Sequence, residues 1–195
     1  MTNTFEPYGA HAIFGLKEVG EPQSLTMNDG TVVDPLFLYE DSAAEADREY
    51  IEVVGDIFHE IVSEGIYDEG IHWAELSVVR FNMSTKHPTL GDIVISIDHS
   101  RPPSRANLNS VNPNAKFPVV HRTRLHIIAT ASEMPGVILQ NQGLPLYVQS
   151  DHLNEWPLTD NIYRLNFRVP LERRDQSGDV VITLNGGAIR MGKVA

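Results

Sequence analysis

The stretch that decides the fold class is Asp92-Ile93-Val94-Ile95-Ser96-Ile97-Asp98. Its isoleucines occupy every second position, so they point to one side of an extended chain, while Val94 and Ser96 point to the other. A period of two is typical of a β-strand that has one face on a core and the other toward solvent. The segment therefore predicts an antiparallel sheet.

The same alternation recurs through the second half of the chain, most clearly in Tyr163 to Leu171. The other predicted strands are 74–83, 117–130, 137–142, 144–149, 180–184 and 188–194. Turn residues in 173–179 and 185–187 predict that the last three strands form a meander. Many short strands joined by turns favour an antiparallel β-sandwich or barrel.

The first 40 residues also predict strands. Asn28-Asp29-Gly30 separates two β-favouring runs, Leu25-Thr26-Met27 and Thr31-Val32-Val33, which is the pattern of a hairpin. Residues 1–40, a following helix and residues 72–195 are expected to form a single domain of 195 residues.

One acidic amphipathic helix is predicted near residues 42–64. Ser42 and Glu45 have the spacing of a capping box, and Gly65 suits the end of a helix. Between them apolar residues recur at helical intervals, with acids on the remaining surface. Gly55 costs about 1 kcal/mol relative to alanine inside this helix. The predicted class is therefore mainly β, bordering on α+β.

The charge of the chain is divided along its length. Residues 1–70 hold sixteen of the 26 acidic residues and two of the 15 basic ones, and the net charge is −11. A protein this acidic is a poor partner for nucleic acids or anionic membranes, so neither is expected. The sequence contains no cysteine, no apparent signal peptide and no apolar run of membrane-spanning length. We therefore expect a cytoplasmic protein.

Two motif-like segments fail on inspection. Residues 187–193 match most of a phosphate-binding loop, but Val194 stands where a Ser or Thr is required. His59-Glu60 begins like a helical zinc motif, but Ser63 replaces the second histidine. No metal and no cofactor are expected, and His59 is interpreted as a helix-surface residue beside acids that raise its pKa.

His121 is the leading catalytic candidate. It shares its strand face with apolar residues, so one interpretation is a core histidine with a hydrogen-bond partner. The other is an acid/base group or a metal ligand inside a barrel, with Asp98 or His99 from a neighbouring strand.

Basic and aromatic residues provide the candidate binding surfaces. The segment 99–116 carries Arg101, Arg105 and Lys116 and no acid. It is predicted to be a long loop that acts as a surface loop, a subunit-contact arm or a ligand lid. Trp156 is interpreted as a core plug or a stacking surface for a ligand. The same-face residues Arg122 and Arg124 form either a solvated face or part of a basic stripe, which would continue through Arg164 and Arg168 if the two strands were neighbours.

Two functional hypotheses follow. The first is a non-enzymatic protein that self-associates as a homo-oligomer, or binds a protein partner, through the acidic helix and the basic surfaces. The second is an enzyme or carrier for a small molecule, of isomerase, cyclase or hydrolase type, with a polar site inside a barrel.

Overall fold

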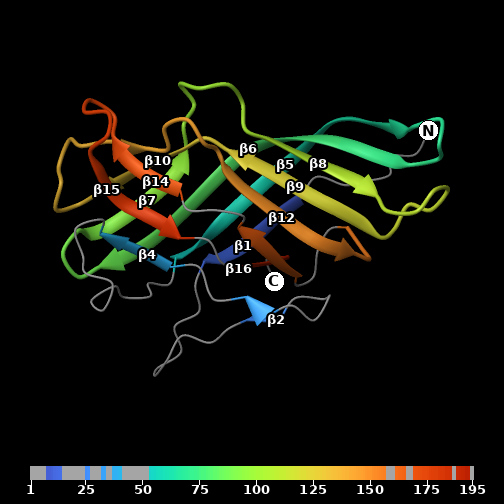
Figure 1. The fold of residues 1–195 in the computed structure, drawn as a ribbon, viewed down its shortest axis with the longest axis horizontal. Helices are drawn as coiled ribbons and strands as arrows, with labels where there is room; N and C mark the ends of the chain where they lie inside the picture. Colours follow the sequence, from blue (N-terminus) through green and yellow to red (C-terminus); the bar gives the residue numbers. More distant parts are fainter. Residues whose placement is uncertain are drawn as a thin grey trace.

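The computed structural model of the chain describes residues 8–14, 25–26, 32–33, 37–40, 53–156, 161–165, 169–185 and 188–193. Within these ranges the chain forms strands and turns and no helix (Figure 1). In this part of the chain there is accordingly no helix with the length and hydrophobicity to span a membrane. The strands are β1 (Tyr8–Phe14), β2 (Leu25–Thr26), β3 (Val32–Val33), β4 (Phe37–Glu40), β5 (Val53–Ile66), β6 (His72–His87), β7 (Gly91–Ile97), β8 (Arg105–Ser110), β9 (Val119–Leu125), β10 (Ile127–Ala131), β11 (Leu139–Gln140), β12 (Leu146–Leu153), β13 (Asn161–Leu165), β14 (Val169–Arg173), β15 (Val180–Asn185) and β16 (Ala188–Lys193).

All described ladders are antiparallel, so the predicted mainly β class is confirmed. One 14-stranded sheet has the order β4-β15-β14-β11-β10-β7-β6-β5-β1-β16-β13-β12-β9-β8. The short strands β2 and β3 pair with each other in a separate sheet, as the turn at Asn28-Asp29-Gly30 predicts.

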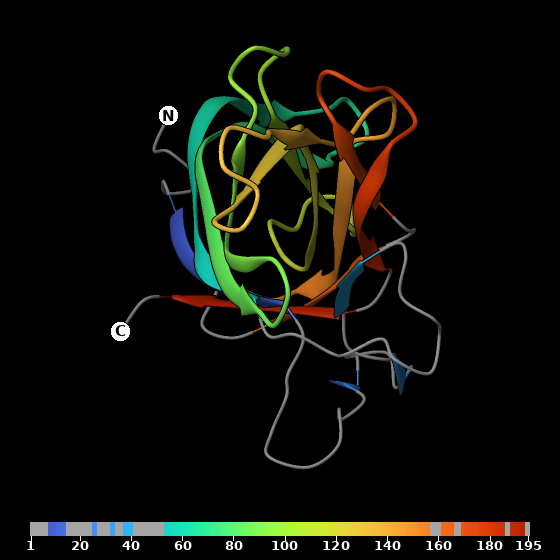
Figure 2. The same ribbon diagram turned by 90° about the vertical axis from the view of Figure 1, so that its left-hand side faces the viewer.

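The long strand β6 joins two parts of this sheet. Its first part, from Trp73 to Ser77, pairs with β8, and its second part, from Asn82 to His87, pairs with β7. Because β6 also pairs with β5, the ladders can be followed from β6 through β5, β1, β16, β13, β12, β9 and β8 back to β6. Figure 2 shows these strands end-on, arranged around the core.

Alternating side chains of these strands form the core. On β7, Ile93, Ile95 and Ile97 are buried, whereas Val94 is 47% exposed, as the period of two predicts. On β8 and β9 the buried residues include Leu108 and Leu125. The opposite faces of β8 and β9 carry polar and charged residues, and this is where a surface site is built.

The acidic helix predicted near residues 42–64 is wrong for residues 53–64, which lie in β5; residues 42–52 fall outside the described ranges. Val53, Ile57 and the residues between them also fit a period of two, and β-branched side chains favour strands. Gly55 lies against the backbone of β6, where an added Cβ would meet the carbonyl oxygen of Asn82. Close pairing with β6 therefore overrides the helical spacing.

The structureless loop predicted over 99–116 is also wrong, because β8 occupies its centre. Asn107 and Asn109 alternate with the buried residues Ala106 and Leu108, but the prolines on either side hide this short pattern. Ladders to β6 on one side and β9 on the other fix the strand in place.

Two predicted strands are each divided in two. The segment 117–130 forms β9 and β10, and the segment Tyr163–Leu171 contributes to β13 and β14. In each case the two halves have different partners: β9 pairs with β8 and β12, whereas β10 pairs with β7 and β11. The predicted meander is correct for β14 and β15 only, because β16 pairs with β1 and β13.

Candidate functional site

His121 lies in the core, where it is 1% exposed. Its Nδ1 atom is 2.9 Å from the hydroxyl of Tyr163, and its Nε2 atom is 3.1 Å from the hydroxyl of Thr123. Burial lowers the pKa of His121 well below 6.5, and the nearby imidazole of His59 lowers it further. In the neutral ring one nitrogen carries a hydrogen, so one hydroxyl accepts a hydrogen bond from the ring and the other donates one.

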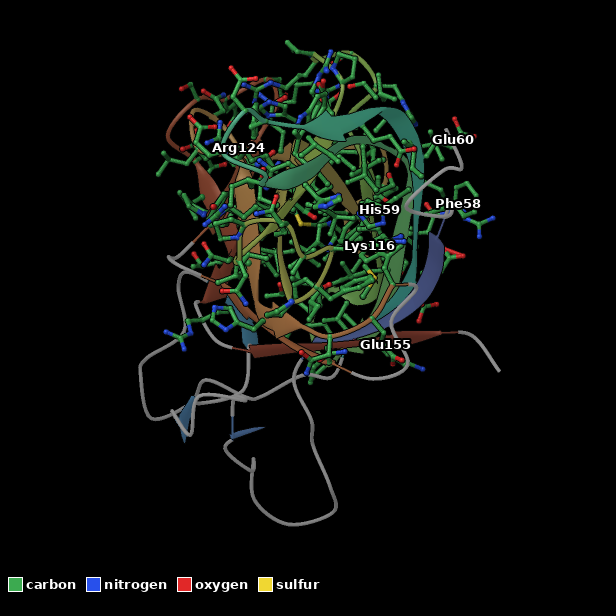
Figure 3. All side chains as sticks on the ribbon, turned by 90° about the vertical axis from the view of Figure 1, so that its right-hand side faces the viewer. Phe58, His59, Glu60, Lys116, Arg124 and Glu155 are labelled. Atoms are coloured by element: carbon green, nitrogen blue, oxygen red, sulfur yellow. The ribbon has the colours of Figure 1, made fainter. Side chains whose placement is uncertain are left out.

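Two further rings complete this interior cluster. The ring centroids of His59 and Trp156 each lie 5.0 Å from that of His121, both in edge-to-face geometry. His59 is fully buried, which corrects its interpretation as a helix-surface residue beside acids. Phe58 and Glu60, the neighbours of His59 on β5, point away from this cluster, as Figure 3 shows.

Asp98 forms its side-chain contacts with Arg174 and Ser100 rather than with His121. Its Oδ2 atom is 2.5 Å from Nη2 of Arg174, and its Oδ1 atom accepts hydrogen bonds from the backbone and hydroxyl of Ser100. Burial raises the pKa of Asp98, but the hydrogen bonds from Ser100 and Arg174 outweigh it, so the pKa lies below 3.8. The backbone NH of Asp98 donates to the carbonyl of His126. That residue is five positions along the chain from His121, roughly 17 Å of extended strand.

The other candidates from the 99–116 segment are dispersed. His99 is exposed on a turn. Arg101 donates from Nη1 to the carbonyl oxygen of Asn141 at 2.7 Å, and Lys116 lies 5.4 Å from the centroid of the Phe117 ring. Of the predicted binding residues, Trp156 belongs to the interior cluster, whereas Arg105, Arg122 and Arg124 come together elsewhere.

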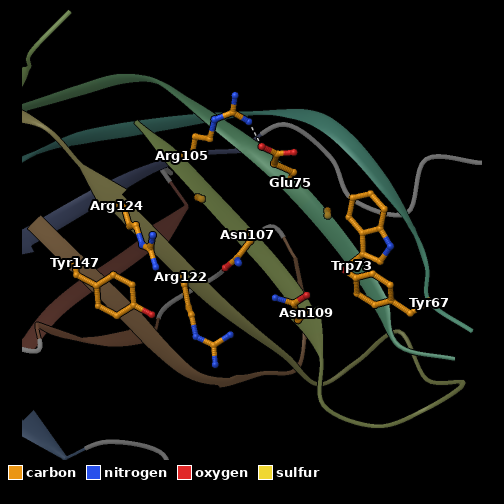
Figure 4. Close-up of a pocket in the computed structure, with 11 residues that line it drawn as sticks. Tyr67, Trp73, Glu75, Arg105, Asn107, Asn109, Arg122, Arg124 and Tyr147 are labelled. Atoms are coloured by element: carbon orange, nitrogen blue, oxygen red, sulfur yellow. Dashed lines mark hydrogen bonds and ion pairs between the residues drawn. The ribbon is translucent and has the colours of Figure 1, made fainter. Parts of the chain in front are cut away.

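These three arginines line a cleft of about 370 Å³ on the outer face of the sheet (Figure 4). The antiparallel register builds it in rows: Arg105 pairs with Arg124, which pairs with Tyr147, and Glu75 pairs with Asn107, which pairs with Arg122. The complete lining is Tyr67, Trp73, Ala74, Glu75, Arg105, Ala106, Asn107, Asn109, Arg122, Arg124 and Tyr147.

The arginines of the cleft have different partners. Arg105 forms an ion pair with Glu75. Arg122 donates from Nε to Oε1 of Gln149 at 3.2 Å, and the guanidinium of Arg124 lies 5.7 Å from the centroid of the Tyr147 ring. Within the described residues neither Arg122 nor Arg124 has an ion-pair partner.

Sequence reasoning identified the arginines of the cleft but not its aromatic residues or its amides. Tyr67 follows β5 and Trp73 begins β6, on either side of a turn. Their place in the same cleft as Arg122 depends on β8 lying between β6 and β9, and β8 was not predicted. The predicted basic stripe required the strands of Arg122 and Arg164 to be neighbours. They are not neighbours, because β12 lies between them and its Gln149 pairs with both residues. Arg168 lies outside the described residues.

Within the described ranges, no group of three or more His, Asp or Glu side chains is arranged to hold a metal ion.

No family model matches the chain, and no curated protein matches it. The structure is similar to that of DynF from the dynemicin biosynthesis pathway of Micromonospora chersina, with a TM-score of 0.67. The match covers 96% of this chain and 79% of DynF at 14% sequence identity. At that identity the similarity concerns the fold.

Proposed function

We propose that this chain binds a small organic molecule in the cleft lined by Arg122, Arg124, Trp73 and Tyr147. The observation that carries the proposal is the convergence of aromatic rings, amides and two arginines in one concavity of about 370 Å³, where neither arginine has an ion-pair partner in the part of the chain that the structure describes. Binding sites for small molecules have volumes of roughly 300–1,000 Å³ and combine apolar surface with a few polar groups.

The side chains of the cleft suit binding better than reaction. Among the described residues, the lining contains no histidine and one carboxylate, that of Glu75, which forms an ion pair with Arg105. We therefore place the protein among carriers or binding proteins. The similarity to DynF, a protein of a biosynthesis pathway, supports a role with organic molecules and does not distinguish a carrier from an enzyme. In this proposal the strands that pair in a closed path from β6 through β5, β1, β16, β13, β12, β9 and β8 form a barrel, and the cleft lies on its outer surface.

The experiment is a screen of a fragment panel by ¹H–¹⁵N NMR. The chain has two tryptophans, so two indole NH signals are expected, and Trp156→Phe assigns them. Compounds that bind the cleft shift the Trp73 signal, and Trp73→Ala reduces their affinity, whereas Trp156→Phe leaves it unchanged. A panel that leaves the Trp73 signal unmoved contradicts the proposal.

An acid/base enzyme of the interior cluster is the second candidate, and one observation favours it. Two predicted site residues, His121 and Trp156, are in contact there, and His121 is neutral with hydroxyl groups at both nitrogens. A neutral imidazole is the form that accepts a proton in catalysis. In the same screen, compounds that shift the Trp156 signal while leaving that of Trp73 unchanged would support this candidate.

A further inference from the structure

The two ends of the cleft differ chemically. Tyr67 and Trp73 stack at one end, with ring centroids 5.7 Å apart and planes inclined by 27°. Arg122 and Arg124 lie at the other end beside Tyr147, as Figure 4 shows. A flat apolar surface therefore faces one half of the cleft, and two positive charges face the other.

The aromatic end is held in place by a glycine. Gly65 on β5 pairs with Trp73 on β6, and a Cβ added to Gly65 would lie 3.0–3.1 Å from three atoms of the indole. The indole therefore lies directly over the glycine backbone. Tyr67, which stacks with this indole, is 52% exposed. The stack is thus both supported from below and accessible to a ligand ring.

The arginine end is also held in place. Oε1 of Gln149 accepts hydrogen bonds from Nε of Arg122 and from the hydroxyl of Tyr147 at 3.4 Å. The ring of Tyr147 in turn lies beneath the guanidinium of Arg124. Arg122 and Arg124 are two residues apart on one strand face, about 7 Å along β9. Two neighbouring guanidinium groups that have no carboxylate partner among the described residues are suited to a carboxylate or a phosphate, which each can bind through paired hydrogen bonds.

The separation of the backbone positions at the two ends sets an upper limit on the distance between the ring and the anionic group of the ligand, because the side chains of both ends extend into the cleft. Trp73 pairs with Asn109, which pairs with Val120, so Arg122 lies two strands across and two residues along from Trp73. These steps amount to about 10 Å across the sheet and 7 Å along it, or roughly 12 Å in total. Between the ends, Asn107 and Asn109 line the cleft and can donate or accept hydrogen bonds.

We infer that the cleft binds an organic anion that carries a flat ring at one end and a carboxylate or phosphate at the other. The inference rests on the proposed function, since it names the ligand class of the same cleft. The ring stacks on Tyr67 and Trp73, and the anionic group lies between Arg122 and Arg124.

Four probes test the inference by calorimetry and by the Trp73 indole signal. They are 2-naphthyl phosphate and 4-(2-naphthyl)butanoate, which carry a ring and an anion, 2-naphthol, which lacks the anion, and inorganic phosphate, which lacks the ring. We expect at least one two-ended probe to bind tenfold or more tightly than either fragment, and the comparison of the two shows whether phosphate or carboxylate is preferred.

Variants assign each end. The double variant Arg122→Gln/Arg124→Gln should lower the affinity of the preferred two-ended probe about tenfold or more and leave that of 2-naphthol unchanged. Arg80→Gln/Lys86→Gln removes the same charge from exposed positions outside the cleft and should have no such effect. Gly65→Val should displace the indole and weaken every probe that carries a ring, and Trp73→Ala provides the same test if that variant does not fold.

Failure of the inference and failure of the proposed function give different results. If 2-naphthol binds as tightly as the two-ended probes, or if only other members of the fragment panel shift the Trp73 signal, the ligand class is overturned and the cleft remains a binding site. If neither the probes nor the panel shifts that signal, both proposals are overturned.

Discussion

At the scale of single residues, the hydroxyl of Tyr163 helps to satisfy a fully buried imidazole. Tyr163→Phe removes the partner of His121 Nδ1 and leaves a polar atom unsatisfied in the core. We expect the free energy of unfolding to fall by about 1–3 kcal/mol, measured by urea denaturation. Tyr147→Phe is the matched control, because its hydroxyl bonds Gln149 in a half-buried position, and its loss should be about 0.5 kcal/mol. Equal losses in the two variants would contradict this account.

His121 also makes stability depend on pH. Its pKa is near 6.5 in the unfolded chain and lower in the folded protein, where burial and then His59 disfavour the charged ring. As the pH falls below about 6.5, the unfolded state binds a proton that the folded state does not, so the free energy of unfolding decreases. The contribution is fully present above that pH and is lost toward lower pH.

The pH effect can be assigned by variants. His126, whose pKa is lowered by burial and by Arg101, contributes in the same direction. Urea denaturation between about pH 7 and pH 5 should show a shallower slope for His121→Asn than for the wild type, with a smaller change for His126→Gln. NMR titration of the wild-type imidazoles provides the same test if His121→Asn does not fold. A His121 signal that titrates near pH 6.5 would count against the assignment.

At the scale of elements, β5 depends on the absence of a side chain at Gly55. A Cβ there would lie 1.9 Å from the carbonyl oxygen of Asn82 and 2.7 Å from Cα of Met83. These are backbone atoms of β6, so Gly55→Ala must push the two strands apart. We expect a loss of about 3 kcal/mol in the free energy of unfolding. Glu60→Ala, at an exposed position of the same strand, should change it by about 0.5 kcal/mol or less. A stable Gly55→Ala variant would show that β5 and β6 do not pair closely.

β5 also shows which parts of the fold the sequence could predict. In β7 the isoleucines alternate with polar or exposed positions and no other period fits, so the strand is predictable. In residues 53–64, Ile57 and Ile61 are four apart and satisfy both a helical and an extended pattern. Local periodicity cannot choose between them, because the choice depends on the pairing of β5 with β6, which lies elsewhere in the sequence.

At the scale of the whole molecule, several basic residues are paired with acids of the same chain. The ion pairs between described residues include Arg80 with Asp56, Arg105 with Glu75, Arg173 with Asp179 and Arg174 with Asp98. The basic surfaces are thus partly neutralised internally, which leaves less charge to drive self-association. We expect light scattering to give the same molar mass at about 50 mM and about 500 mM salt. A mass that falls as salt is added would instead support association through complementary charge.

The cleft is a property of the whole molecule rather than of any one segment. The alternation along β9 is sufficient to predict that Arg122 and Arg124 share a face. It cannot place Trp73 or Tyr147 beside them, because their positions follow from the strand order β6-β8-β9-β12 and its register. A shift of one residue in any of these ladders would turn the lining side chains of that strand away from the cleft.

A crystal structure of the protein with the preferred two-ended probe bound would decide whether the cleft takes an organic anion that carries a flat ring. We expect the naphthyl ring to lie on Trp73 and Tyr67 and the anionic group of the probe to lie within hydrogen-bond distance of Arg122 and Arg124. A ligand bound beside His121 in the interior, or a cleft that stays empty at saturating ligand, would contradict this expectation.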